Sequence, residues 1–77
     1  MDKARREKLR DALRYLSNVI LIVDQVCEKE EDCVENYPEN LMGSERFEKM
    51  EDAVENLNEA MERLDEAKGF IQAACAR

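Results

Sequence analysis

The chain has 77 residues, 40% of them charged, and a formal net charge of −7. So small a domain buries little core, so it normally needs disulfides, a metal or self-association as well. Without histidine, and with three cysteines in no framework spacing, the sequence disfavours structural zinc, disulfides and histidine-based catalysis, so we expect a reduced, cytoplasmic, non-enzymatic protein without cofactor or metal.

The first predicted element is a long helix from about residue 2 to 36. Its apolar residues recur at alternating intervals of four and three, the pattern of a heptad seam. The seam comprises Leu9, Leu13, Leu16, Ile20, Val23 and Cys27. Ala12, Val19 and Val26 form a second column, and Leu21 and Ile22 make residues 19–23 apolar nearly all round. Such a helix must be covered on several sides.

A loop is expected at residues 37–43, because Pro38 disfavours helix there. Leu41 and Met42 are expected to fold back over the end of the core. Ser44 is the predicted N-cap of a second helix, which extends to about residue 75. Gly69 either lies inside this helix or ends it, leaving a short separate turn after it.

The second helix carries the same pattern as the first. Its seam comprises Phe47, Met50, Val54, Leu57, Met61, Leu64, Lys68, Ile71 and Cys75. Small residues stand beside the seam seven positions apart, where they would let another helix approach closely; they are Ala53, Ala60, Ala67 and Ala74.

The fold class predicted from these patterns is all-α, an antiparallel two-helix hairpin that self-associates into a four-helix or larger bundle. A lone hairpin would leave residues 19–23 exposed, so we expect at least a homodimer. The expected oligomer core comprises Leu13, Leu16, Ile20, Leu21, Ile22, Val23, Val54, Leu57, Met61 and Leu64. The sequence leaves the number of chains and their direction open. The longest apolar run is too short for a membrane span or a signal peptide.

Charge is strongly segregated along the expected hairpin. The turn half, residues 24–59, holds thirteen acidic and three basic side chains. The open half, residues 1–23 with 60–77, holds six acidic and nine basic side chains. The chain as a whole is too acidic to favour long nucleic acid. Three interpretations are open: an antiparallel second copy pairs unlike ends, the basic end binds a small anion, or the charges are simply solvated.

The anion-binding interpretation rests on four bases that share one helix face within about 80°. They are Lys3, Arg6, Arg10 and Arg14. Tyr15 is close in sequence, and a symmetric hairpin would place Phe70 opposite Arg10. Arginine beside an aromatic ring suits a phosphate and a base, so the ligand class expected is a small phosphorylated nucleotide.

Residues 36–60, NYPENLMGSERFEKMEDAVENLNEA, carry a more specific pattern. They resemble a segment of small acidic proteins from Firmicutes, their prophages and mobile elements, which carry a run like NLPENLQ-S-ER-E-MEEAVDNLEEAID. The resemblance implies a helical hairpin and a phage or mobile-element setting, and it implies no site. The arginine-rich start and residues 19–23 depart from that group.

In such a setting, the first functional expectation is counter-defence by sequestering a nucleotide-type ligand at the basic end. The second is a protein–protein inhibitor, whose acidic turn half would occupy a basic, nucleic-acid-binding surface of a host defence protein, as in some anti-CRISPR proteins. The third is a structural assembly module with neither activity.

Overall fold

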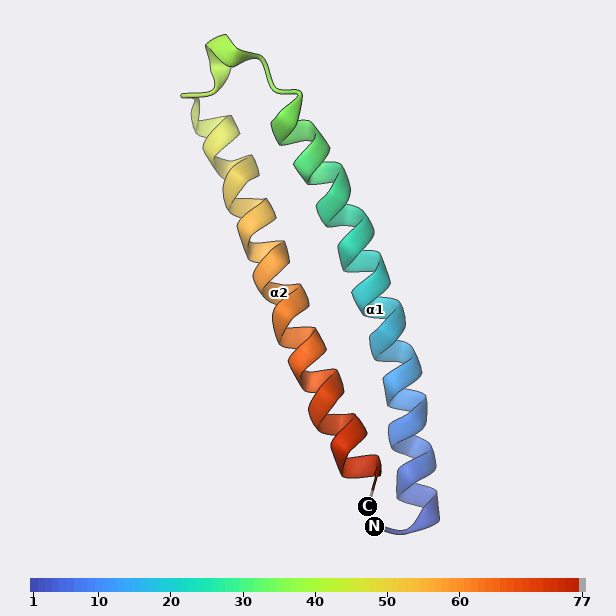
Figure 1. The fold of residues 1–77 in the computed structure, drawn as a ribbon. Helices are drawn as coiled ribbons and strands as arrows, with labels where there is room; N and C mark the ends of the chain where they lie inside the picture. Colours follow the sequence, from blue (N-terminus) through green and yellow to red (C-terminus); the bar gives the residue numbers. More distant parts are fainter. Residues whose placement is uncertain (77) are drawn as a thin grey trace.

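The computed structural model describes residues 1–76, and in this part of the chain two long helices form an antiparallel hairpin (Figure 1). Helix α1 spans Lys3–Glu35, a short 3-10 helix η1 spans Glu39–Leu41, and α2 spans Glu45–Cys75. The hairpin is a rod of 59 × 15 × 13 Å. The predicted all-α hairpin is therefore confirmed.

Each long helix begins at a capping side chain. The carboxylate of Asp2 accepts a hydrogen bond from the backbone N–H of Arg5 at 2.8 Å. The hydroxyl of Ser44, the N-cap indicated by the sequence, accepts one from the backbone N–H of Phe47 at 3.2 Å. These bonds satisfy amide groups that the first turn of a helix leaves unpaired. Helix α2 then continues through Gly69 without a break.

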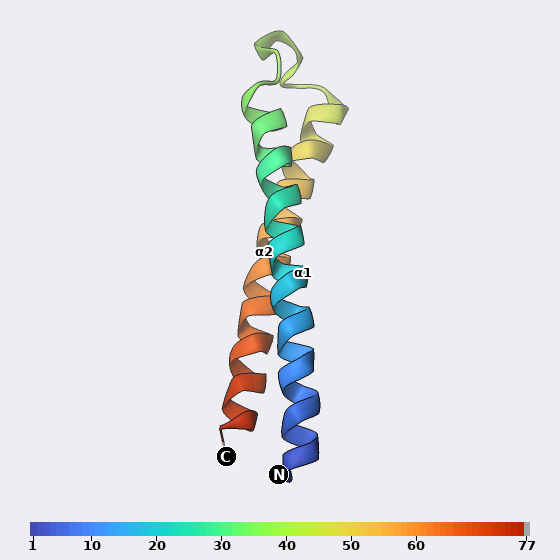
Figure 2. The same cartoon turned by 90° about the vertical axis from the view of Figure 1, so that its right-hand side faces the viewer.

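The two heptad seams face each other within one chain. Figure 2 shows the helices crossing at a shallow angle and staying adjacent along the rod. Among residues 1–76, only Cys27 and Phe47 are buried, and the other seam residues are half-buried. Two helices without a third layer cannot enclose their apolar side chains, so the core of the isolated hairpin is thin.

The turn end is closed by an aromatic pair. Tyr37, just beyond α1, stacks against Phe47 in the first turns of α2, with ring centroids 5.2 Å apart. Leu41 and Met42, expected to cover this end, instead lie on the surface. The loop that holds them lies beyond the ends of both helices (Figure 1), and the backbone N–H groups of Leu41 and Met42 donate within it, to the carbonyl oxygens of Pro38 and Glu39.

The pairing of the helices is offset from the expected one. The thiol of Cys27 donates to the side-chain oxygen of Asn58 at 3.6 Å, and Tyr37 meets Phe47. Both contacts shift α2 by about one helical turn relative to a symmetric hairpin. Arg10 therefore lies at the level of Cys75, and the expectation that Phe70 lies opposite Arg10 is wrong.

Candidate functional site

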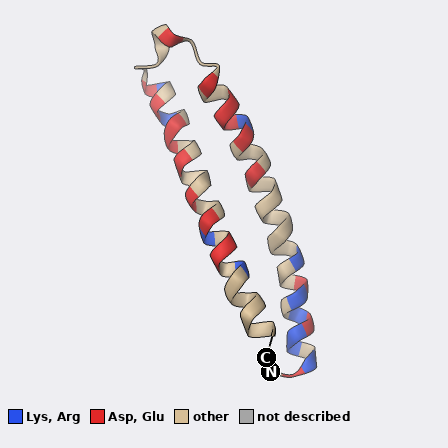
Figure 3. Cartoon of the chain, in the orientation of Figure 1, with Lys and Arg blue, Asp and Glu red and all other residues tan. Residues whose placement is uncertain are grey.

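The basic end of the rod is formed by the first turns of α1 (Figure 3). Lys3 pairs with Glu7, with Nζ and Oε1 4.0 Å apart, and Arg14 pairs with Asp11. Arg10 is exposed and makes no ion pair within residues 1–76. Two of the four bases expected to hold an anion are thus already compensated by acids on their own helix, which weakens the field of the cluster.

The structure does not bring the two aromatic residues to this cluster. Tyr15 and Phe70 are 73% and 77% exposed, and both point away from the contact between the helices. The observed pairing places them at the same level of the rod, about one turn from Arg10. Phe70 lines a shallow hollow only with Glu66, Gly69 and Ala73 of its own helix.

A different set of residues forms the hollow at the basic end. Arg5 and Lys8 line it together with Met1 and Leu9, and its volume is about 330 Å³. Arg5 is bound to Asp2, with Nε and Oδ2 3.6 Å apart, whereas Lys8 makes no ion pair within residues 1–76. The sequence interpretation missed this pair, although their spacing of three already places them together on another face of the helix.

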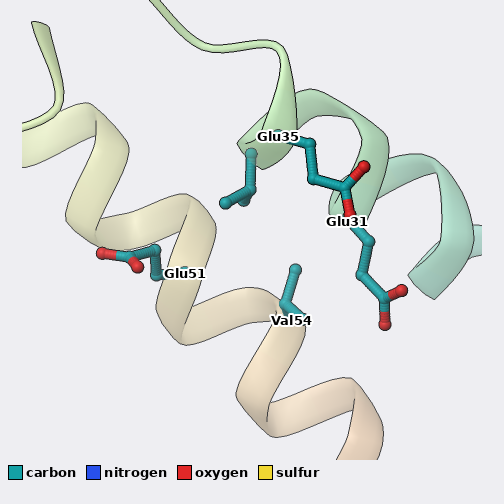
Figure 4. Close-up of a pocket in the computed structure, with 5 residues that line it drawn as sticks. Glu31, Glu35, Glu51 and Val54 are labelled. Carbon is teal, nitrogen blue, oxygen red and sulfur yellow. The ribbon is translucent and has the colours of Figure 1, made fainter. Parts of the chain in front are cut away.

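A second hollow lies near the turn, where Glu31, Val34 and Glu35 of α1 meet Glu51 and Val54 of α2 (Figure 4). Its volume is about 250 Å³. Two valines and three glutamates therefore line it. Within residues 1–76, no three cysteine, aspartate or glutamate side chains gather in a way that could hold a metal ion.

Cys27 is the most deeply buried side chain, at 1% exposure. Its thiol donates to a carboxylate oxygen of Glu31 at 3.3 Å and to Asn58 at 3.6 Å. Burial, reinforced by the hydrogen bond and charge of Glu31, raises the pKa of the thiol above its ordinary value. A neutral, buried thiol is a poor nucleophile, so this cysteine is a packing residue.

The residues expected in the oligomer core divide into two groups. Eight lie half-buried in the contact between α1 and α2; they are Leu13, Leu16, Ile20, Val23, Val54, Leu57, Met61 and Leu64. Leu21 and Ile22 are 53% and 54% exposed. Val19 and Val26 are also exposed, so the middle of α1 presents apolar side chains to its surroundings.

No family model, curated protein or solved structure matches this chain. Within residues 1–76, neither helix has an apolar stretch of the length that crossing a membrane requires.

Proposed function

We propose that this chain is a non-enzymatic binding protein that works as a homo-oligomer. The observation that supports this is its exposed surface. The hairpin exposes 6029 Å², whereas a compact monomer of 9.0 kDa exposes about 4,900 Å². The excess exceeds the roughly 800 Å² per partner that a stable protein interface buries. Exposed valine, leucine and isoleucine side chains in the middle of α1 form part of it.

Sedimentation equilibrium or light scattering at micromolar concentration tests the proposal. We expect a particle whose mass is at least twice that of the 9.0 kDa chain. A well-folded particle of single-chain mass throughout the micromolar range would overturn it.

As an alternative to pairing of the basic end with a second copy, we propose that this end binds a small phosphorylated ligand of the nucleotide class. The hollow lined by Arg5 and Lys8 supports this, because it sets two cations beside the apolar side chains of Met1 and Leu9. Arg10 adds a third cation nearby in the sequence that is not compensated by an acid within residues 1–76. A phosphate would meet the cations, and a base could lie on the apolar surface.

Calorimetry with a panel of cyclic and linear nucleotides tests this second proposal. Binding should be lost in Lys8→Glu/Arg10→Glu and retained in Arg46→Glu/Lys49→Glu, which makes the same charge change at the turn end. No heat with any nucleotide would end it. A counter-defence role in a phage or mobile element rests on the resemblance of residues 36–60 alone.

The acidic turn half supports an alternative partner, a basic protein surface. Three glutamates, Glu31, Glu35 and Glu51, line the hollow together with two valines, so they could meet lysine or arginine side chains of a partner. Capture of a host protein that is released at high salt, and that a Glu31→Gln/Glu35→Gln/Glu51→Gln variant no longer captures, would favour this alternative. Capture that is insensitive to salt would count against it.

A further inference from the structure

The two sides of the hairpin differ in chemistry. Glu31 directly follows position 30, the next position of the α1 heptad after Cys27, and Glu51 directly follows Met50 of the α2 seam. Both glutamates line the same hollow. Residues seven apart lie on the same side of a heptad helix. The residues spaced by seven from Glu31 in α1 and from Glu51 in α2 therefore lie on one common side of the hairpin. These residues are polar: Ser17, Asp24, Glu31, Glu51, Asn58, Asp65 and Gln72.

The opposite side of the hairpin is made by the residues that flank the other edge of each seam. None of them is charged over the middle of the rod. We call this side the apolar face, and it consists of Ala12, Val19, Val26 and Cys33 of α1 and Ala53, Ala60, Ala67 and Ala74 of α2. Ile22 and Tyr15 extend the face outward on α1, because they lie one turn from Val19 and Val26.

The apolar residues of the two helices are centred at the same height. On α1, the exposed stripe from Tyr15 to Val26 has its middle between Val19 and Ile22. On α2, the alanine column from 53 to 74 has its middle between Ala60 and Ala67. The pairing of Cys27 with Asn58 puts these two midpoints at one level. A single two-fold axis through that level would match both helices at once.

We propose that a second copy of this chain docks on the apolar face, turned end for end. In this arrangement, which rests on the proposed self-association, α1 packs along α1 of the other copy and α2 along α2. Every pair of neighbouring helices in the resulting four-helix bundle is antiparallel. The polar side of each hairpin, with its row of carboxylates, stays in water.

Charge selects the direction of the second copy. The first fourteen residues carry six bases and three acids, whereas the turn half carries thirteen acids and three bases. Docking end for end sets each basic end beside the acidic half of the other copy. Docking in the same direction would stack one acidic half on the other, and that repulsion opposes it.

The shapes on the face also fit this direction. Rotation about the two-fold axis brings Tyr15 of one copy to the level of Val26 in the other. It brings Phe70 to the level of residues 57–59, next to Ala60 on the apolar face. Large exposed rings thus meet smaller side chains. Alanines every seventh residue allow the two α2 helices to approach closely, as they could not if these positions held large residues.

Adjacent residues provide a matched pair of variants for the face. Ile22 and Leu21 are almost equally exposed, at 54% and 53%, but only Ile22 lies on the apolar face. In sedimentation equilibrium, the Ile22→Glu variant should have the mass of a single chain, whereas the Leu21→Glu variant should keep the mass of the wild-type oligomer. Ala67→Glu should behave like Ile22→Glu, and Gln72→Glu, on the polar side, should behave like wild type.

Several outcomes separate this inference from the proposal that it rests on. A wild-type protein of single-chain mass would overturn both the proposed self-association and the proposed docking on the apolar face. An intact oligomer in Ile22→Glu that dissociates in Leu21→Glu would overturn the face alone. If Ile22→Glu loses helix as well as mass while Leu21→Glu loses neither, the face is supported, because folding is then linked to docking there.

Native Cys33 reports the direction of docking. Cys33 is exposed. Along α1, Cys33 follows the midpoint between Val19 and Ile22 by the same number of residues as Lys8 precedes it. Docking end for end therefore sets Cys33 of one copy beside Lys8 of the other. In a Cys27→Ala/Cys75→Ala background, a short bismaleimide should join the chains efficiently only after Lys8→Cys. Efficient joining of Cys33 to Cys33 without that change would overturn the end-for-end direction.

Discussion

At the scale of single residues, the three cysteines show how far a seam pattern predicts burial. The sequence placed Cys27 and Cys75 in the seams, and the structure buries Cys27 fully and Cys75 partly. The hydrogen bond from Cys27 to Asn58 was not predictable. It depends on which residue of α2 reaches the level of Cys27, and periodicity within one helix does not contain that information.

The differing burial predicts an order of thiol reactivity. With a disulfide reagent at neutral pH, Cys33 should react fastest, Cys75 more slowly, and Cys27 only as the hairpin opens. In denaturant, all three should react at similar rates. Mass spectrometry of digested samples quenched at intervals measures the order. Fast modification of Cys27 in the native protein would contradict the observed packing.

The raised pKa of Cys27 predicts an alkaline loss of stability. The folded state holds the thiol neutral, so its contribution is complete below the ordinary thiol pKa of about 9 and is lost as the pH rises through the higher folded value. The free energy of unfolding by urea should therefore fall more steeply above pH 9 in wild type than in Cys27→Ala. Identical slopes would show that other groups cause the alkaline loss.

At the scale of helices and their connection, the heptads predicted both helices and their facing seams, because a period of 3.5 residues is a local property of the chain. The offset between the helices was not predictable. The offset is set by the path of η1 and by the stacking of Tyr37 on Phe47. The prediction that Phe70 lies opposite Arg10 was wrong for this reason. The four predicted bases do lie on one helix, α1, but the ion pairs of Lys3 with Glu7 and of Arg14 with Asp11 reduce their charge.

Gly69 offers a test of helix α2. It lies within the continuous helix, and a methyl group added there would meet nothing within 4 Å. Gly69→Ala should therefore stabilise the protein by about 1 kcal/mol, the usual cost of glycine in a helix interior. Thermal unfolding followed by circular dichroism should show a midpoint higher by about 4–8 °C. Gly43→Ala, outside both helices, serves as the control and should change the midpoint little.

At the scale of the whole molecule, a thin core and a large exposed surface suggest that folding and association are linked. Two copies that stabilise each other should unfold at a temperature that depends on concentration. A hundredfold increase in protein concentration should raise the midpoint by roughly 5 °C. The same series with Ile22→Glu should show no dependence. A constant midpoint for wild type would show that the hairpin is stable by itself.

Helix α1 begins and helix α2 finishes at the same tip of the 59 Å rod (Figure 1). A fluorophore or a fused domain joined near Lys3 would therefore sit beside one joined near Cys75 of the same copy. Across an end-for-end pair, by contrast, such cargo would be held at opposite tips, separated by nearly the length of the rod. The pair would thus act as a rigid spacer between domains fused to its two copies.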